Sequence, residues 1–504
     1  MKFIDDILNT ITMYRLVLYF LLYLLFVAFV YSIFGILPFN PLLLVISASL
    51  LTAICWVTNK LFSYVYTVPT NVESVYITAL ILSLIISPIK SFSDLPLYFF
   101  AGVLSIASKY ILTIHKKHIF NPVAIAVVLT AIGFNGSASW WIGTMPMLPF
   151  VLLGFLIVRK IRRFDLVFYF FIATLLTILG FSVVNGSNIL LVLKETILST
   201  ALCFFAFVML TEPLTTPPTK KLQAIYGIIV GILFAPQFHI GSFYTTPELA
   251  LIAGNIYAYF VSPKFKIFST LQQKIRLAPD IFEFLFLPSK KLAFSPGQYM
   301  EWTFAHKHTD SRGNRRYFTI ASSPTEDEIK LGVKFYQNGS SYKKAMLLMD
   351  NKTPIIGAQL SGDFTLPKDS SKKLVFIAGG IGITPFRSMI KYLLDTKEKR
   401  TITLLYSNKT QDEIVYSDIF TMAQKELGIK VIYTLTDTKA VLTSWAGRLG
   451  RIDQNMITQE IPDYKDRIFF LSGPHVMIDA YDQTLRSMGI SEKQIKKDFF
   501  PGFV

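Results

Sequence analysis

Long apolar runs dominate the chain up to about Val261, and beyond that point short apolar stretches alternate with polar residues. A hydrocarbon core of roughly 30 Å is crossed by about 20 helical residues, or by fewer where neighbouring helices surround a short one. The pattern predicts a multi-pass α-helical membrane bundle of about ten helices over residues 1–262. The candidate segments are Leu16–Ile36, Leu42–Val57, Val75–Ile86, Leu95–Ile114, Pro122–Phe134, Met145–Val158, Leu166–Phe181, Ile189–Leu210, Ala224–Phe234 and Leu249–Val261.

The rest of the chain divides into two patterns. Residues 268–368 contain short alternating stretches separated by Pro and Gly, which is typical of a small antiparallel β-barrel. Residues 371–504 alternate between strand and helix, which predicts a parallel α/β domain. The expected barrel strands are Ile281–Leu287, Tyr299–Phe304, Tyr317–Ala321 and Ile329–Tyr336. The expected α/β elements are the strands Leu374–Ala378, Thr401–Tyr406, Lys430–Thr434 and Arg467–Leu471 and the helices Phe386–Leu394, Ser417–Glu426 and Val476–Met488.

Basic residues gather in every second loop of the predicted bundle. By the positive-inside rule, ten spans place both termini and the two following domains in the cytoplasm of a cell whose membrane holds the bundle. The same topology explains much of the formal net charge of +16, so we exclude nucleic acid as a partner and expect lipid instead. One side carries Lys2, Arg15, Lys60, Lys116, Lys117, Arg159, Lys160, Arg162, Arg163, Lys220, Lys221, Lys264 and Lys266, and the other carries Lys90 and Lys194.

The few metal-binding side chains limit the electron carriers that the chain can hold. Only two cysteines are present, Cys55 and Cys203, whereas an iron–sulfur cluster needs four thiolates. None of the six histidines lies in the middle of an apolar segment, which argues against membrane haem. We therefore predict no metal site, and any electron carrier is expected to be a flavin or a quinone.

Three polar segments stand out in the apolar half: Glu73-Ser-Val-Tyr-Ile-Thr-Ala-Leu, Lys117-His-Ile-Phe-Asn-Pro122 and Leu210-Thr-Glu-Pro-Leu-Thr-Thr-Pro217. With them, residues 40–262 resemble a family of membrane proteins found as components of the sodium-pumping NADH:quinone reductase and of the Rnf complex. The resemblance implies a ten-helix bundle that holds a flavin and passes electrons through it. The Ser-Gly-Ala-Thr motif that attaches FMN in that family is missing here, so FMN or riboflavin is expected to bind without a covalent bond.

The polar residues of this half also have structural interpretations. Asn121–Pro122 is a good helix start, with Asn as the cap and Pro at the first helical position. Glu212 lies near a predicted membrane boundary, where a charge is common. Trp140 and Trp141 fit an interfacial aromatic belt. A ligand role and a structural role therefore both stay open for these residues.

Two motifs in the soluble half point to cofactor chemistry. Gly379-Gly-Ile-Gly-Ile-Thr-Pro385 follows the first strand of the α/β domain, where backbone N–H groups and a helix start can bind a pyrophosphate. Arg316-Tyr-Phe-Thr319 in the predicted barrel combines a fixed charge for a diphosphate, an aromatic face for a planar ring and a hydroxyl. Together they predict a site for a flavin and a dinucleotide.

With these motifs, residues 268–504 resemble the ferredoxin–NADP reductase superfamily, in which an FAD barrel precedes an NAD(P) domain. Further matching segments are Gly339-Ser-Ser341, Trp445-Ala-Gly-Arg-Leu-Gly-Arg451, Ser472-Gly-Pro474 and Lys497-Asp-Phe-Phe-Pro-Gly502. The resemblance implies FAD binding by Arg316, Tyr317, Phe318, Thr319, Gly339, Ser340 and Ser341. It implies binding of the nicotinamide dinucleotide by Gly379, Gly380, Gly382, Thr384, Gly473 and Pro474. Thr319, Ser472 and Phe500 are then the catalytic candidates, with Ser472 in place of the usual cysteine.

Both NADH and NADPH are open as the dinucleotide. Ser407-Asn-Lys409 could bind a 2′-phosphate, whereas Asp412 and Glu413 oppose one and favour NADH. We expect a membrane-bound NAD(P)H oxidoreductase that passes hydride to FAD and then single electrons, through a flavin or quinone in the bundle, to quinone or to an acceptor across the membrane. Two alternatives are a redox-driven Na⁺/H⁺ transport subunit and a membrane-anchored flavin reductase that serves a partner protein.

Overall fold

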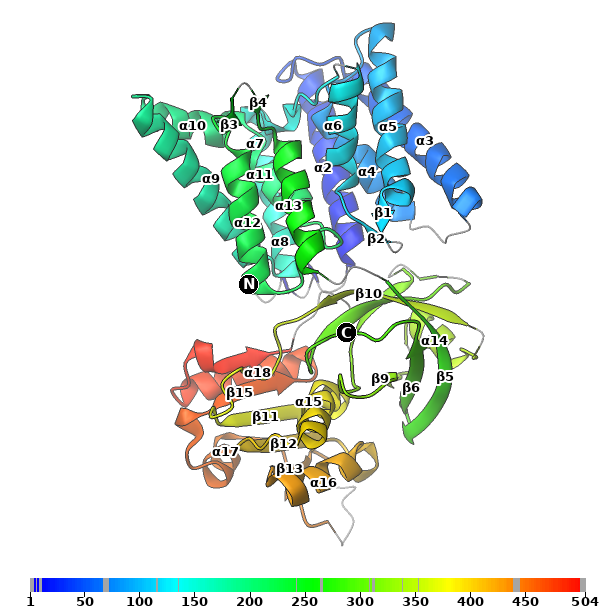
Figure 1. The fold of residues 1–504 in the computed structure, drawn as a ribbon, viewed down its shortest axis with the longest axis vertical. Helices are drawn as coiled ribbons and strands as arrows, with labels where there is room; N and C mark the ends of the chain where they lie inside the picture. The colour runs from blue at the N-terminus through cyan, green and yellow to red at the C-terminus, as the bar shows by residue number, and fades with distance from the viewer. Residues whose placement is uncertain are drawn as a thin grey trace. The chain divides into compact units, whose positions relative to one another are not determined.

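The chain divides into two compact units that meet in the sequence at Lys266 and Ile267. A computed structural model describes the fold of both units (Figure 1). The described residues are 4–5, 7–8, 11–66, 72–114, 117–134, 136–241, 243–262, 266–307, 309–310, 313–337, 339–351, 353–437 and 445–498.

The first unit consists mainly of helices, and each of the ten predicted apolar segments contains helical residues. Its long helices are α2 (Met13–Ile33), α3 (Pro41–Tyr66), α4 (Val72–Ile85), α5 (Leu95–Ile111), α6 (Pro122–Phe134), α9 (Phe164–Val184), α10 (Ile189–Ser199), α12 (Lys220–Phe234) and α13 (Pro247–Val261). Shorter pieces are α7 (Leu148–Val151), α8 (Phe155–Ile161), α11 (Leu202–Phe204) and the π-helix η5 (Phe205–Met209). Two two-stranded hairpins join helices: β1 (Thr113–Ile114) with β2 (Lys117–His118), and β3 (His239–Ile240) with β4 (Phe243–Tyr244).

The number of helices that can span a membrane is smaller than the sequence predicts. Among the described residues, three helices are long and apolar enough, α2, α3 and α9, and a fourth span would combine α10 with α11–η5 across a 58° bend. The other segments yield shorter helices because the chain breaks them. Pro146 and Pro149, for example, leave Met145–Val158 as short 3-10 and α-helical pieces. Length and composition thus support three or four spans, not ten.

Packing within this unit relies on small residues between helices and leaves large apolar side chains outside. A Cβ on Gly227 or on Gly231 of α12 would lie 2.6 Å from a backbone oxygen of α9, so only glycine permits this approach. Phe26 on α2, Leu61 on α3 and Leu176 on α9 are each about 60% exposed, at 64%, 59% and 63%. Small residues inside and apolar residues outside are the pattern of helices packed in lipid.

The second unit begins with an antiparallel domain. Its six strands lie in the order β8-β7-β10-β5-β6-β9, and all neighbouring strands are antiparallel. β5 and β10 are not among the strands that the sequence predicted. The strands are β5 (Ile267–Ala278), β6 (Ile281–Pro288), β7 (Tyr299–Thr303), β8 (Arg315–Thr319), β9 (Ile329–Lys334) and β10 (Pro354–Ser361), and one helix, α14 (Ser341–Leu347), joins β9 to β10.

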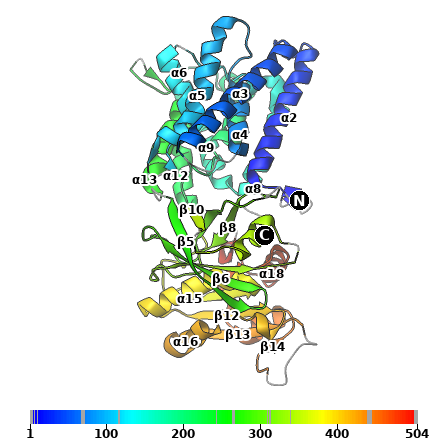
Figure 2. The ribbon, with the colours of Figure 1, turned by 90° about the vertical axis from the view of Figure 1, so that its right-hand side faces the viewer.

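A parallel sheet with helices on both faces completes the second unit (Figure 2). Its strand order is β14-β13-β12-β11-β15-β16. The strands are β11 (Leu374–Gly379), β12 (Ile402–Asn408), β13 (Lys430–Leu435), β14 (Arg448–Leu449), β15 (Ile468–Ser472) and β16 (Ile495–Lys497). The helices are α15 (Thr384–Thr396), α16 (Ser417–Leu427), α17 (Gln454–Glu460) and α18 (His475–Ser487).

Two buried clusters explain this layering. Apolar residues of α15 and α16 form one cluster with one face of the sheet, and residues of α17 and α18 form the other cluster with the opposite face. The first cluster also includes Ala278 and Ile281, so it joins the antiparallel domain to the parallel one. The strand order reverses between β11 and β15, and ligands of such sheets bind at the carboxyl ends of the strands at this point.

Candidate functional site

Two signature loops meet where the strand order reverses. The turn Gly379–Gly382 follows β11, and Ser472-Gly-Pro474 follows the neighbouring strand β15. A Cβ on Gly382 would lie 2.6 Å from the Cα and N of Gly473, and one on Gly379 would lie 2.2 Å from the Sδ of Met477. The two loops therefore contact each other closely, and the backbone contact at position 382 requires glycine.

The glycine-rich turn leads directly into a helix start. Gly380 has a φ of +52°, and nothing lies within 4 Å of the place where its Cβ would be. Thr384 begins α15, and Pro385 occupies the first turn, where a missing N–H is harmless. Backbone N–H groups at the start of a helix carry partial positive charge. The turn thus offers open backbone and a favourable dipole to an anion at the carboxyl edge of the sheet.

An anionic side chain lies beside the residues assigned to the FAD diphosphate. The carboxylate of Asp310 accepts a hydrogen bond from the backbone N–H of Ser341 at 2.9 Å and lies 3.5 Å from the guanidinium of Arg316. Ser340 caps the same helix start, because its Oγ accepts from the N–H of Lys343. Arg316 is 7% exposed. Arg316 and Ser341 thus form a site whose donors suit a phosphate oxygen, so the residues fit the expected cofactor.

The aromatic residues near Arg316 occupy both faces of β8. The guanidinium of Arg316 lies 5.1 Å from the ring centre of Tyr342, which in turn is 6.1 Å from the ring of Phe318. Tyr317 points to the other face, as alternation along a strand requires, and its hydroxyl donates to Gln359 Oε1 at 3.0 Å. Thr319, the last residue of β8, is buried. The structure therefore groups Arg316 and Phe318 with α14 and places Tyr317 apart from them.

The serine in place of the usual cysteine has an acidic partner. Ser472 Oγ donates to Asp498 Oδ2 at 2.9 Å, and the backbone N–H of Asp498 donates to Leu471 O at 2.8 Å. Burial raises the pKa of Asp498 to about 7, although the hydrogen bond from Ser472 acts in the opposite direction. No sequence motif pairs these two residues, which are 26 positions apart. Phe500, the third catalytic candidate, lies outside the described residues.

The end of β12 is the region where a 2′-phosphate would have to bind. Asn408, the last residue of the strand, is 3% exposed. Glu413, whose negative charge would repel a 2′-phosphate, forms an ion pair with Lys334 of β9 at 2.9 Å. Its charge is therefore balanced within the protein, which weakens the case against NADPH.

Two polar motifs of the first unit come together with α13. Asn121 Nδ2 donates to Glu212 Oε2 at 2.8 Å, and Thr215 Oγ1 donates to the same oxygen at 3.0 Å. The backbone N–H of Asn121 donates to Asn255 Oδ1 at 2.7 Å. Asn255 also donates to the Tyr226 hydroxyl at 3.0 Å. We call this set the amide–carboxylate cluster; its members are Asn121, Glu212, Thr215, Tyr226 and Asn255.

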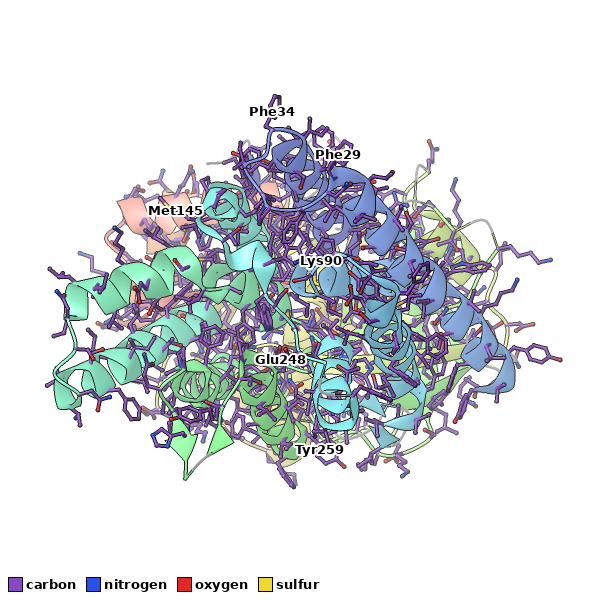
Figure 3. All side chains as sticks on the ribbon, turned by 90° about the horizontal axis from the view of Figure 1, so that it is seen from above. Phe29, Phe34, Lys90, Met145, Glu248 and Tyr259 are labelled. Carbon is purple, nitrogen blue, oxygen red and sulfur yellow. The ribbon has the colours of Figure 1, made fainter. Side chains whose placement is uncertain are left out.

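The cluster extends toward a histidine, and a second carboxylate lies two turns along α13. His118 Nε2 is 3.8 Å from Glu212 Oε1. Asn121 also caps α6, since its Oδ1 accepts from the N–H groups of Val123 and Ala124, so the structural interpretation of Asn121 holds beside its contact with Glu212. Glu248 is 4% exposed and accepts the indole N–H of Trp140 at 2.7 Å. Figure 3 shows Glu248 among the helices of this unit.

Comparison with known proteins gives matches within the second unit. Residues 376–483 match the family Oxidoreductase NAD-binding domain. The chain is 24% identical over 240 residues to a flavohemoprotein of Oceanobacillus iheyensis, with 45% of this chain and 57% of that protein covered. It is 25% identical over 230 residues to a glycine betaine monooxygenase reductase subunit of Chromohalobacter salexigens, with 44% and 60% covered. The cytochrome b5 reductase domain of Ulva prolifera nitrate reductase is similar at 22% identity with a TM-score of 0.41, over 47% of this chain and 98% of that domain.

These matches lie in the second unit. Residues 376–483 resemble oxidoreductase NAD-binding domains. Over somewhat less than half of the chain, the sequence is similar to a flavohemoprotein and to a monooxygenase reductase subunit, which agrees with a ferredoxin reductase-like oxidoreductase module. The chain spans 57% and 60% of the lengths of the two relatives named above.

Proposed function

We propose that the chain is a membrane-bound NAD(P)H oxidoreductase that passes electrons from its second unit to an acceptor group in its first. The observation that carries this proposal is the meeting of the Gly379–Gly382 turn with Ser472-Gly-Pro474 at the carboxyl edge of the parallel sheet. That geometry suits a dinucleotide whose pyrophosphate lies on the turn and whose nicotinamide lies near Ser472.

Residues of the second unit supply binding and orientation. Arg316 and the backbone N–H of Ser341, which now contact the Asp310 carboxylate, would hold the diphosphate of FAD. Phe318 would pack against the ring system of FAD, and the hydroxyl of Thr319 would orient it. Asp498, whose pKa burial raises to about 7, accepts the hydrogen bond of the Ser472 hydroxyl and holds it in position. When bound, FAD supplies the step from a two-electron hydride to single electrons.

The first unit provides the membrane part of the route. Its exposed apolar helices support a multi-pass protein of the cell membrane. With an even number of spans, the basic residues in alternate loops would favour a cytoplasmic location for both termini and the second unit. Polar groups inside an apolar helical unit mark a functional site by default. We assign the amide–carboxylate cluster to an acceptor group, a non-covalent FMN or riboflavin or a quinone, in line with the sequence resemblance of residues 40–262. The final acceptor is quinone or an acceptor across the membrane.

A second candidate function is redox-driven Na⁺ or H⁺ transport. It is favoured by one observation, the burial of Glu248 at 4% exposure in a helix that also carries Asn255 of the cluster. Both residues lie on the same side of α13, because they are two helical turns apart.

The flavin content of the purified full chain tests the proposal. Extraction and mass spectrometry should find FAD together with a second flavin or a quinone, and NADH should reduce an added quinone analogue. FAD alone, reduced by NADH without transfer to quinone, would favour a membrane-anchored reductase that serves a partner protein. Charge movement in liposomes that requires Na⁺ or a proton gradient would favour the transport function.

A further inference from the structure

Helix α15 begins directly after the Gly379–Gly382 turn and contacts the antiparallel domain through buried polar groups. Arg387 donates through both terminal nitrogens to the two oxygens of Glu326, and its Nη1 also donates to Ala321 O at 3.1 Å. The next residue, Ser388, donates from Oγ to Ser322 O at 2.6 Å. The Arg387 and Glu326 side chains are 5% and 12% exposed. The contact is therefore a buried, two-point link between the domains.

Both ends of this link lie close in sequence to the proposed reaction site. Arg387 is one helical turn after Thr384, which closes the glycine-rich turn. Ala321 lies two residues after Thr319, the end of the strand that carries the flavin motif. A shift at Arg387 would move the start of α15 relative to the end of β8, because close-packed interiors transmit strain.

Gly332 lies at a second close contact between the antiparallel and the parallel domain. A Cβ on Gly332 of β9 would lie 2.8 Å from Thr384 Cγ2 and 2.8 Å from the hydroxyl oxygen of Tyr416. The guanidinium carbon of Arg387 lies over the same Tyr416 ring, 5.7 Å from its centre. The antiparallel domain thus approaches the start of α15 so closely that a side chain at position 332 would have to displace its neighbours.

The charges show that the link is an ion pair. Burial by itself would raise the pKa of Glu326, but the hydrogen bonds and charge of Arg387, together with Lys330, hold that pKa at about 2. Lys330 Nζ lies 2.8 Å from Glu326 Oε1, and the backbone N–H of Ser323 donates to Oε2 at 2.7 Å. Both oxygens of this carboxylate therefore have partners from the parallel domain and from the antiparallel domain.

We propose that Arg387, Glu326 and Gly332 are positioning residues that set the distance between the bound nicotinamide and the flavin. This inference rests on the proposed function, because it concerns the same hydride step. A displacement of about 1 Å at a reacting pair can lower a rate by about 10²-fold. Lysine cannot replace the planar fork of arginine at a bidentate contact, so Arg387→Lys keeps the charge and loses the geometry.

The test uses the purified full chain with bound FAD. Anaerobic stopped-flow reduction by saturating NADH, unlabelled and 4-deuterated, is measured for the wild type, Arg387→Lys, Glu326→Gln and Gly332→Ala. The matched control is Arg467→Lys: Arg467 is 11% exposed and pairs with Asp463 at 2.7 Å, but it precedes β15, at the amino edge of the sheet. Hydrogen–deuterium exchange of residues 320–326 in flavin-free protein gives a readout that is independent of activity.

We expect the three positioning variants to lose about 10-fold or more of the limiting hydride-transfer rate, with changed isotope effects and unchanged FAD content. Exchange in residues 320–326 should rise in Arg387→Lys and Glu326→Gln but not in Arg467→Lys. FAD-loaded positioning variants that match the wild-type rate and isotope effect would overturn the positioning role alone. A wild-type chain with bound FAD that NADH does not reduce would overturn the proposed function and the positioning role together.

Discussion

Replacing Gly382 by alanine tests the meeting of the two signature loops. The added Cβ would lie 2.6 Å from Gly473 Cα, Gly473 N and the carbonyl carbon of Ser472. All three are backbone atoms, so no side-chain rotation can relieve the contact, and one loop must move. Overpacking of this kind costs about 1–3 kcal/mol. If the substitution destabilises the dinucleotide-bound state by this amount, the efficiency of hydride transfer decreases roughly 5- to 150-fold.

The assay is anaerobic stopped-flow reduction of bound FAD over a range of NADH concentrations. FAD content should stay at the wild-type level, because the substitution lies in the parallel domain. The control is Gly428→Ala, where φ is +70° but nothing lies within 4 Å of the new Cβ. That variant should lose about 1 kcal/mol of stability from backbone strain and keep its rate. Wild-type efficiency in Gly382→Ala would show that these loops do not form the dinucleotide site.

Three further predictions concern single charged groups. Arg316→Met should weaken FAD binding roughly 10- to 150-fold, because a charge-assisted hydrogen bond is worth about 1.5–3 kcal/mol. Titration of the flavin-free chain with FAD measures this affinity, and an unchanged affinity would exclude the diphosphate role of Arg316. Burial raises the pKa of Asp498 to about 7, so the folded chain holds a proton that the unfolded chain releases near pH 4, and folding stability falls as pH rises between these values. Asp498→Asn should therefore gain melting temperature over the wild type between pH 5 and about pH 8, and a constant difference would contradict the raised pKa. Glu212→Ala removes the carboxylate that accepts hydrogen bonds from Asn121 and Thr215. The variant should transfer electrons to quinone more slowly, and its FAD should be reduced by NADH at the wild-type rate. Equal slowing of both steps would argue against an electron acceptor at the amide–carboxylate cluster.

Local patterns predicted the elements that carry the second unit's motifs. The run Leu374–Ala378 followed by Gly379 and Gly380 indicated a strand and a turn, and β11 ends at Gly379, one residue beyond the predicted strand. Such signals lie within a few residues of one another and depend on backbone chemistry. The strand β10 was missed, because its pairing with β5 joins residues about 85 positions apart. The strand β5 was missed although it also pairs with the next strand, β6.

The contacts that shape the site could not be read from the sequence. Arg387 and Glu326 are 61 positions apart, and each alone resembles an ordinary surface charge. Asp498 and Ser472 likewise meet only because β16 runs parallel to β15. In the first unit the motifs with Asn121 and Glu212 were singled out, but Asn255 and Tyr226, which complete the cluster, carry no local signal.

Only part of the predicted number of membrane spans is supported, for a related reason. Apolar composition identifies a helix but does not say where it breaks. Thr200 and Ala201 interrupt the segment Ile189–Leu210, where the chain bends by 58°. Helices such as α4 and α6, with 14 and 13 residues, are helical as predicted but short for a bilayer.

Anaerobic titration of the purified full chain with NADH tests the proposed electron route most directly. We predict that the FAD loses its oxidised absorbance completely only after two equivalents of NADH per chain, because the acceptor group of the first unit takes up one of them. A quinone analogue added afterwards should restore that absorbance. A chain that binds no FAD, or whose FAD stays oxidised in excess NADH and NADPH, would contradict the proposed function.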